Sequence, residues 1–136
     1  MSSLDDIIAR ENITVMNVPC SQCGSMSLMA DSGNCYIGLD SSSELSAEEM
    51  LVHKAHEVGH CVEGAFYNRY SMLDVISRHE KRADSWAIRQ LIPEDKLIKA
   101  FESGLLEIWQ LAEKFGVTEE FMKKACRFYG YYYDEL

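Results

Sequence analysis

The chain has 136 residues and an apolar fraction of 47%, enough for one domain with a hydrophobic core. Its 22 acidic residues outnumber its 13 Lys and Arg residues, and the net charge of −9 argues against general binding to nucleic-acid phosphates. No stretch approaches the roughly eighteen uncharged apolar residues of a membrane span. The first six residues carry acids where a secretory signal would carry Lys or Arg. We therefore expect a cytoplasmic protein that binds no membrane and is not built to bind nucleic acid.

The first third of the sequence predicts a short helix and a small sheet. Residues 2–12 have an apolar side typical of a helix, and the β-branched run 13–18 favours a strand that Pro19 ends. Apolar and polar residues alternate within 25–39, around the turn-forming segment 31–34, which predicts a β-hairpin. We expect about three strands in an antiparallel sheet.

The sequence that follows predicts helices. Ser46 with Glu49 three residues later is a capping-box pattern, and the helix that begins there should run to about Glu63. A second long helix should run from about Ser77 to Ile92 and stop at the proline that follows.

Two or three shorter helices are expected over 94–103, 105–115 and 118–130, with glycines at the breaks between them. A small sheet followed by helices is the α+β pattern. No linker divides the chain, so we expect residues 1–136 to form a single domain.

The clearest chemical signal is an H-E-x-x-H motif formed by His56, Glu57 and His60 inside the first long helix. Residues four apart lie one turn above each other, so both imidazoles can reach one metal ion, and the glutamate lies near enough to take a proton from the attacking water. At about 100° per residue, the apolar residues of this helix gather on one side and the ionisable residues on the other. A surface helix can show the same division, so the motif needs further support.

A catalytic zinc site needs a third protein ligand and an open position for water. The acidic candidates near the second long helix are Asp74, Glu80 and Asp84. The last two share one face with small alanines, which would let the two long helices approach closely. Glu80 could then bind the metal, while Asp84 could accept the free N–H of a ligand imidazole.

These residues form two motifs in order: His56-Glu57-x-x-His60, then Glu80-x-x-Ala83-Asp84-x-Trp86-Ala87-x-x-x-Leu91-Ile92-Pro93. Together they resemble the ImmA/IrrE family of bacterial and phage metallopeptidases over residues 46–93. The resemblance implies a zincin-like core in residues 1–93 with a helical tail in 94–136. It also implies a single zinc ion whose third ligand is Glu80, and a helix-turn-helix transcriptional repressor as the protein substrate, cleaved to relieve repression in a phage or mobile element.

The expected mechanism follows from zinc chemistry, in which the metal acidifies water and polarises the scissile carbonyl. Glu57 would act as general base on the water and then pass the proton to the leaving amine. A further group should stabilise the developing oxyanion. The candidates are Tyr67, Tyr70, His53 and His79, and the sequence does not choose among them.

Five cysteines, an odd number in a chain in which we expect no export signal, favour reduced thiols over a disulfide framework. The pair Cys20-x-x-Cys23 invites a zinc or redox interpretation. However, only Cys35 lies near enough to add a ligand, and no helix is predicted to begin at the pair. We expect an incidental turn.

The segment 111–125 resembles a helix-turn-helix element, but Glu119 and Glu120 stand at the start of its second helix and would repel phosphate. Lys123 and Lys124 follow and partly offset this charge, yet packing or protein docking is favoured. Two alternatives to a peptidase stay open. One is a non-catalytic, metal-containing module that sequesters a regulatory protein, and the other is a protein that binds DNA through its C-terminal helices.

Overall fold

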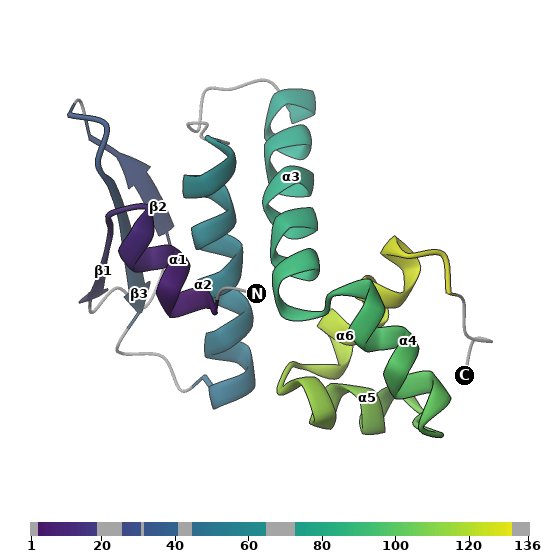
Figure 1. Cartoon of the computed structure of the whole chain (residues 1–136). Coiled ribbons are helices and arrows are strands. Elements are labelled where there is room, and N and C mark those ends of the chain that lie inside the picture. Colours follow the sequence, from purple (N-terminus) through teal and green to yellow (C-terminus); the bar gives the residue numbers. More distant parts are fainter. Residues whose placement is uncertain (1–2, 19–25, 31, 41–44, 65–72, 132–136) are drawn as a thin grey trace.

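The computed structural model of the chain describes residues 3–18, 26–30, 32–40, 45–64 and 73–131. These residues form a three-stranded sheet and six helices (Figure 1), which confirms the predicted α+β fold class. No helix among them has both the length and the apolar character needed to cross a membrane. In chain order the elements are α1 (Leu4–Arg10), β1 (Ile13–Val18), β2 (Met26–Met29), β3 (Cys35–Asp40), α2 (Ala47–Glu63), α3 (Leu73–Leu91), α4 (Glu94–Glu102), α5 (Ile108–Phe115) and α6 (Glu119–Phe128).

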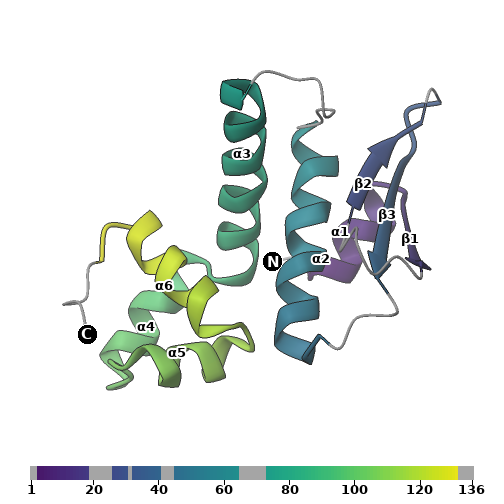
Figure 2. The same cartoon turned by 180° about the vertical axis from the view of Figure 1, so that it is seen from behind.

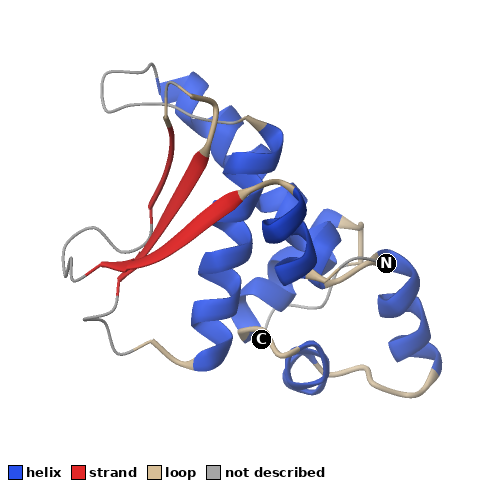
Figure 3. Cartoon of the chain, turned by 60° about the vertical axis from the view of Figure 1, so that its left-hand side comes forward, coloured by secondary structure: helices blue, strands red, loops and turns tan. Residues whose placement is uncertain are grey.

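The sheet has the strand order β1-β3-β2, with β3 in the centre (Figure 3). β2 pairs antiparallel with β3, with Met29 opposite Cys35, as the hairpin prediction requires. β1 pairs parallel with β3, with Ile13 opposite Cys35, so the sheet is mixed and the prediction of an antiparallel sheet is wrong. The physical reason is that alternating apolar residues indicate which face of a strand is buried, but not the direction of its neighbour. Burial accounts for the strand order alone: β3 carries the buried side chains of Ile37 and Leu39 and takes two neighbours, whereas the exposed β2 stays at the edge.

α2 lies between the sheet and α3, as two opposite views show (Figures 1 and 2). It begins with the predicted capping box: the Ser46 hydroxyl accepts from the Glu49 N–H, and the Glu49 carboxylate accepts from the Ser46 N–H, at 3.1 Å each. It ends at Gly64, which has the left-handed conformation (φ 63°) that glycine favours. On the apolar side of the helix, Ala55 and Val58 are completely buried.

α3 begins at Leu73, earlier than the predicted Ser77, because no proline or glycine interrupts the segment. Its small residues Ala83 and Ala87 are completely buried, in agreement with the expected close approach of α2. A Cβ atom placed on Gly59 of α2 would lie 2.7 Å from the carbonyl oxygen of Ala83. The two helix backbones are therefore in direct contact at this point.

A disulfide joins Cys35 of β3 to Cys61 of α2, whose Cα atoms are 5.9 Å apart. The expectation of reduced thiols is therefore wrong for this pair. The two residues are 26 positions apart in the sequence and meet only because β3 packs on α2. Cys126 is a free, buried thiol, and the Cys20-x-x-Cys23 pair lies outside the described residues.

The tail helices α4, α5 and α6 cluster beside the C-terminal end of α3 (Figure 1). Gly116 (φ 69°) ends α5, and the Thr118 hydroxyl caps α6 by accepting from the Phe121 N–H at 3.1 Å. The two helices of the predicted helix-turn-helix element are thus present, but their assignment to such an element stays a prediction. The buried residues of α4, α5 and α6 are Leu97, Ala100, Leu111, Ala112, Phe121, Met122, Ala125 and Cys126.

Candidate metal centre

The H-E-x-x-H motif lies on the side of α2 that faces α3. His56 and His60 are one turn apart, and their rings meet edge to face with centroids separated by 4.8 Å. Glu57 and His60 keep only 6% and 5% of their surface exposed. The ionisable side of this helix is therefore enclosed by protein, unlike that of a surface helix that contains the motif by chance.

Glu80 on α3 completes a cluster with the two histidines. Its Oε2 lies 2.9 Å from His56 Nε2, and its Oε1 lies 3.0 Å from His60 Nε2. The two histidine Nε2 atoms are 3.2 Å apart. Within the described part of the chain, these three side chains could hold a metal ion, because their donor atoms all lie within 4.8 Å of one another. They are the three residues predicted from the sequence as ligands.

The spacing of the donor atoms fits a zinc ion. Tetrahedral zinc binds nitrogen and oxygen ligands at about 2.0–2.2 Å, which places those ligand atoms about 3.3 Å from one another. The two Nε2 atoms, 3.2 Å apart, are close to this value, and each lies 2.9 or 3.0 Å from a different oxygen of the Glu80 carboxylate. The Glu80 side chain is 36% exposed, so solvent can reach the cluster and occupy an open position. A cation between the rings would also allow both Nε2 atoms to face each other without a proton.

Asp84, one turn beyond Glu80, contacts the other ring nitrogen of His56: its Oδ1 is 2.7 Å from Nδ1. Its Oδ2 is 3.2 Å from the Nζ of Lys124 on α6. Burial alone would raise the pKa of Asp84, but the hydrogen bond and charge of His56, followed by the charge of Lys124, lower it. Asp84 is therefore held as an anion, which accepts the His56 Nδ1 proton and leaves Nε2 for the cluster.

The same contacts act on His56. Burial would lower the pKa of His56, but the hydrogen bond to Asp84 and the negative charges of Asp84 and Glu80 outweigh burial and raise it. The surroundings of this imidazole are thus strongly negative, and they favour a positive charge at the point where the donor atoms meet.

The candidates for stabilising an oxyanion do not join this cluster in the described part of the chain. His53 lies about one turn before His56 on α2, and His79 precedes Glu80 on α3; both are partly buried, and neither belongs to the group of converging donors. Tyr67 and Tyr70 lie outside the described residues, so their proposed role stays a prediction.

Two residues of the site were not predicted as part of it. Gly59 allows α2 to contact α3 directly. The sequence carried a signal for this contact, since a glycine inside a helix costs about 1 kcal/mol and indicates a packing reason. Lys124 contacts Asp84 from a position 40 residues later in the sequence. No local pattern could have indicated that contact.

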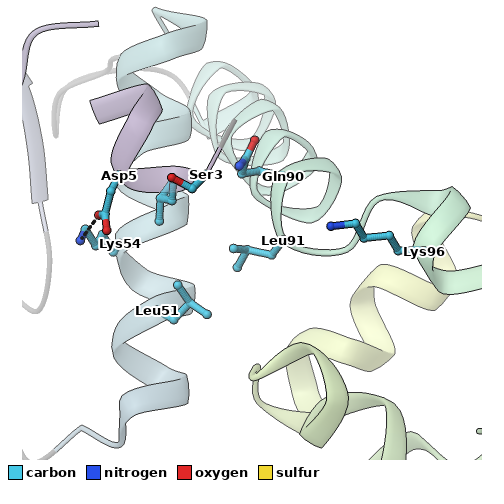
Figure 4. A pocket seen from close by; sticks show the side chains of 8 residues that line it. Ser3, Asp5, Leu51, Lys54, Gln90, Leu91 and Lys96 are labelled. Atoms are coloured by element: carbon cyan, nitrogen blue, oxygen red, sulfur yellow. Dashed lines mark hydrogen bonds and ion pairs between the residues drawn. The ribbon is translucent and has the colours of Figure 1, made fainter. Parts of the chain in front are cut away.

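Two hollows lie on different sides of α2. A groove of about 150 Å³ lies between Val52 and His53 of α2 and Phe121 and Lys124 of α6. A larger hollow of about 490 Å³ lies between α1, α2, α3 and α4 (Figure 4). Lys54, which lines it, is roughly opposite the histidines around α2 at about 100° per residue. The larger hollow is therefore separate from the donor cluster.

Two histidines and a glutamate that converge beside a buried glutamate, on two packed helices of which the first lies on a small sheet, are typical of the metallopeptidase class. The chain belongs to the family of the IrrE N-terminal-like domain, Peptidase_M78, whose model matches residues 10–127. The match confirms the resemblance seen in the two sequence motifs and includes the sheet and both long helices. No match to the chain was found among curated proteins.

Proposed function

We propose that the protein is a zinc-dependent endopeptidase in which His56, His60 and Glu80 bind the zinc ion and Glu57 is the general base. The observation that carries this proposal is the convergence of the three donor atoms within 4.8 Å, beside a glutamate that is 6% exposed. Membership of a peptidase family supports the class of reaction. A bound zinc ion would acidify a water molecule and polarise the scissile carbonyl.

Glu57 performs the proton transfers in this proposal. Its carboxylate accepts a proton from the attacking water as the water oxygen bonds to the carbonyl carbon. The same carboxylate then donates that proton to the amine nitrogen as the C–N bond breaks, so the proton count balances. Asp84 holds the ring of His56 through the 2.7 Å contact to Nδ1 and keeps Nε2 available as a donor.

The proposed substrate is a helix-turn-helix transcriptional repressor, cleaved in the cytoplasm to relieve repression in a phage or mobile element. Support for this substrate comes from the resemblance to the ImmA/IrrE family. The net charge of −9 is compatible with a basic protein partner, since opposite charge favours encounter.

The proposal is tested with Glu57→Gln, which keeps the size of the side chain but removes the base. Glu48→Gln, at an exposed position in the first turn of α2, is the matched control. Each protein is incubated with zinc and a repressor of this class, and new chain ends are identified by mass spectrometry. We expect zinc to bind to the unmodified chain and to both variants, and cleavage to be lost only in Glu57→Gln. Cleavage that persists in Glu57→Gln refutes the mechanism. The non-catalytic alternative is favoured if the unmodified chain and both variants bind the repressor stoichiometrically but do not cleave it, even with added manganese.

A further inference from the structure

Lys124 connects the C-terminal tail to the candidate zinc ligands. Its Nζ lies 3.2 Å from Asp84 Oδ2, while Oδ1 of the same carboxylate lies 2.7 Å from His56 Nδ1. Each carboxylate oxygen therefore has its own partner, and rotation of the carboxylate would break both contacts. Lys124 also lines the groove of about 150 Å³ between α2 and α6.

α6 holds this lysine in a defined position. Met122 and Ala125, on the inner face of α6, are completely buried. At the end of the helix, the Tyr129 hydroxyl donates to the Ile92 carbonyl at 2.8 Å and ties α6 to the end of α3. Because α3 also carries the aspartate, the two members of the ion pair belong to elements that are fixed relative to each other.

We propose that Lys124 is a positioning residue of the metal centre, which fixes the Asp84 carboxylate so that His56 presents Nε2 to the ion. This inference rests on the proposed zinc site. Two effects oppose each other, since orientation of the ligand strengthens metal binding while the positive charge of the lysine repels a cation. The carboxylate and the imidazole ring stand between the ammonium and the donor atom, and the lysine side chain is 52% exposed, so solvent weakens the repulsion. Orientation should therefore dominate.

The experiment compares three variants of the full chain. Lys124→Met removes the ammonium and keeps most of the stem, Lys124→Arg keeps the charge and the donors, and Lys123→Met changes an exposed lysine about 100° away around α6. The zinc dissociation constant is measured by competition with a chelator, and the ligand geometry by the absorption spectrum of the Co²⁺-loaded protein. Thermal unfolding of the metal-free proteins shows whether each variant is folded.

We expect Lys124→Met to weaken zinc binding about three- to tenfold and to alter the cobalt spectrum. This loss is smaller than the roughly 10- to 100-fold typical of removing an orienting carboxylate itself. The Lys124→Arg and Lys123→Met proteins should match the unmodified chain. In an Asp84→Ala background, Lys124→Met should have no further effect, because the lysine acts through that carboxylate.

Three results would overturn the inference: unchanged affinity and spectrum in Lys124→Met, tighter binding that shows simple charge repulsion, or an equal loss in the Asp84→Ala background. These results differ from a failure of the proposed function. If the unmodified chain binds no zinc, the metal site itself is refuted, whatever the lysine variants do.

Discussion

Gly59 of α2 faces Ala83 of α3 so closely that a Cβ atom on Gly59 would lie 2.7 Å from the Ala83 carbonyl oxygen and 3.1 Å from its Cα. The opposing atoms belong to the backbone of a helix, which cannot turn aside as a flexible side chain would. His60 follows the glycine directly, and Glu80 lies one turn before the alanine. The contact that sets the spacing of the two helices therefore also sets the distances between the donor atoms.

Gly59→Ala should therefore destabilise the protein, although the same change at an unhindered helix position stabilises by about 0.5–1 kcal/mol. The added methyl group must push α3 away, which typically costs about 1–3 kcal/mol, and should also weaken zinc binding. Urea unfolding of the metal-free protein and zinc competition measure the two effects. Val62→Ala, at a position of α2 that is 36% exposed, is the control. A gain in stability for Gly59→Ala would show that the helices are not in contact there in solution.

Zinc should stabilise the folded chain because the donor atoms converge only when α2 and α3 are packed together. At a free zinc concentration 100 times the dissociation constant the gain is about 2.7 kcal/mol, or roughly 10 °C in Tm for a domain of this size. His60→Ala and Glu80→Ala should lose this gain, while Glu113→Ala, at an exposed position of α5, should keep it. Metal analysis of each purified protein completes the comparison. Zinc retained by Glu80→Ala but lost by His60→Ala would mean that the third ligand is wrongly assigned.

Cys126 should resist alkylation while the protein is folded. Burial raises the pKa of its thiol from 9.0 to about 11, which lowers the fraction of reactive thiolate near neutral pH by about a hundredfold before access is considered. Because the unfolded thiol ionises at lower pH than the folded thiol, this group also makes folding less stable as pH rises from 9.0 to about 11. Iodoacetamide labelling of Cys126, followed by mass spectrometry, should be fast in urea and slow in buffer. Equal rates would show that α6 does not bury this side chain.

The features that the sequence predicted well depend on local spacing. A hydroxyl and a carboxylate three residues apart are enough to place the start of α2 at Ser46, and the glycine that ends α5 needs no distant partner. The predicted ligands depend on local spacing only in part. His56 and His60 share a face by helix geometry. Glu80 comes from another helix, and its place was predicted from the small alanines on its face, which indicate close packing with α2.

The features that the sequence did not predict depend on contacts between distant segments. Alternating apolar residues indicate that a strand exists, but not whether its neighbour runs parallel, so the pairing of Ile13 with Cys35 could not be foreseen. The contact between Lys124 and Asp84 depends on how the tail packs beside α3, which no periodicity specifies. The disulfide has the same origin, because Cys61 meets β3 only in the folded chain.

That disulfide should make a measurable contribution to stability. A bond between Cys35 and Cys61, 26 residues apart, restricts the unfolded chain and should stabilise the folded state by about 3 kcal/mol. Reduction with a dithiol should therefore lower the urea midpoint of unfolding by roughly 1–3 M, given ordinary slopes for small domains.

Cys61→Ser distinguishes the bond from a general effect of reductant. This variant should unfold at the lower midpoint and show no further response to the dithiol, whereas the unmodified chain should respond fully. Because Cys61 directly follows His60 in α2, zinc affinity measured in the same variant tests whether the tether also supports the donor cluster. If β3 is held to α2 by packing of Ile37 and Val58, both completely buried, affinity should change less than threefold while stability falls. A midpoint that reductant leaves unchanged in the unmodified chain would show that the two thiols lie side by side without forming the bond.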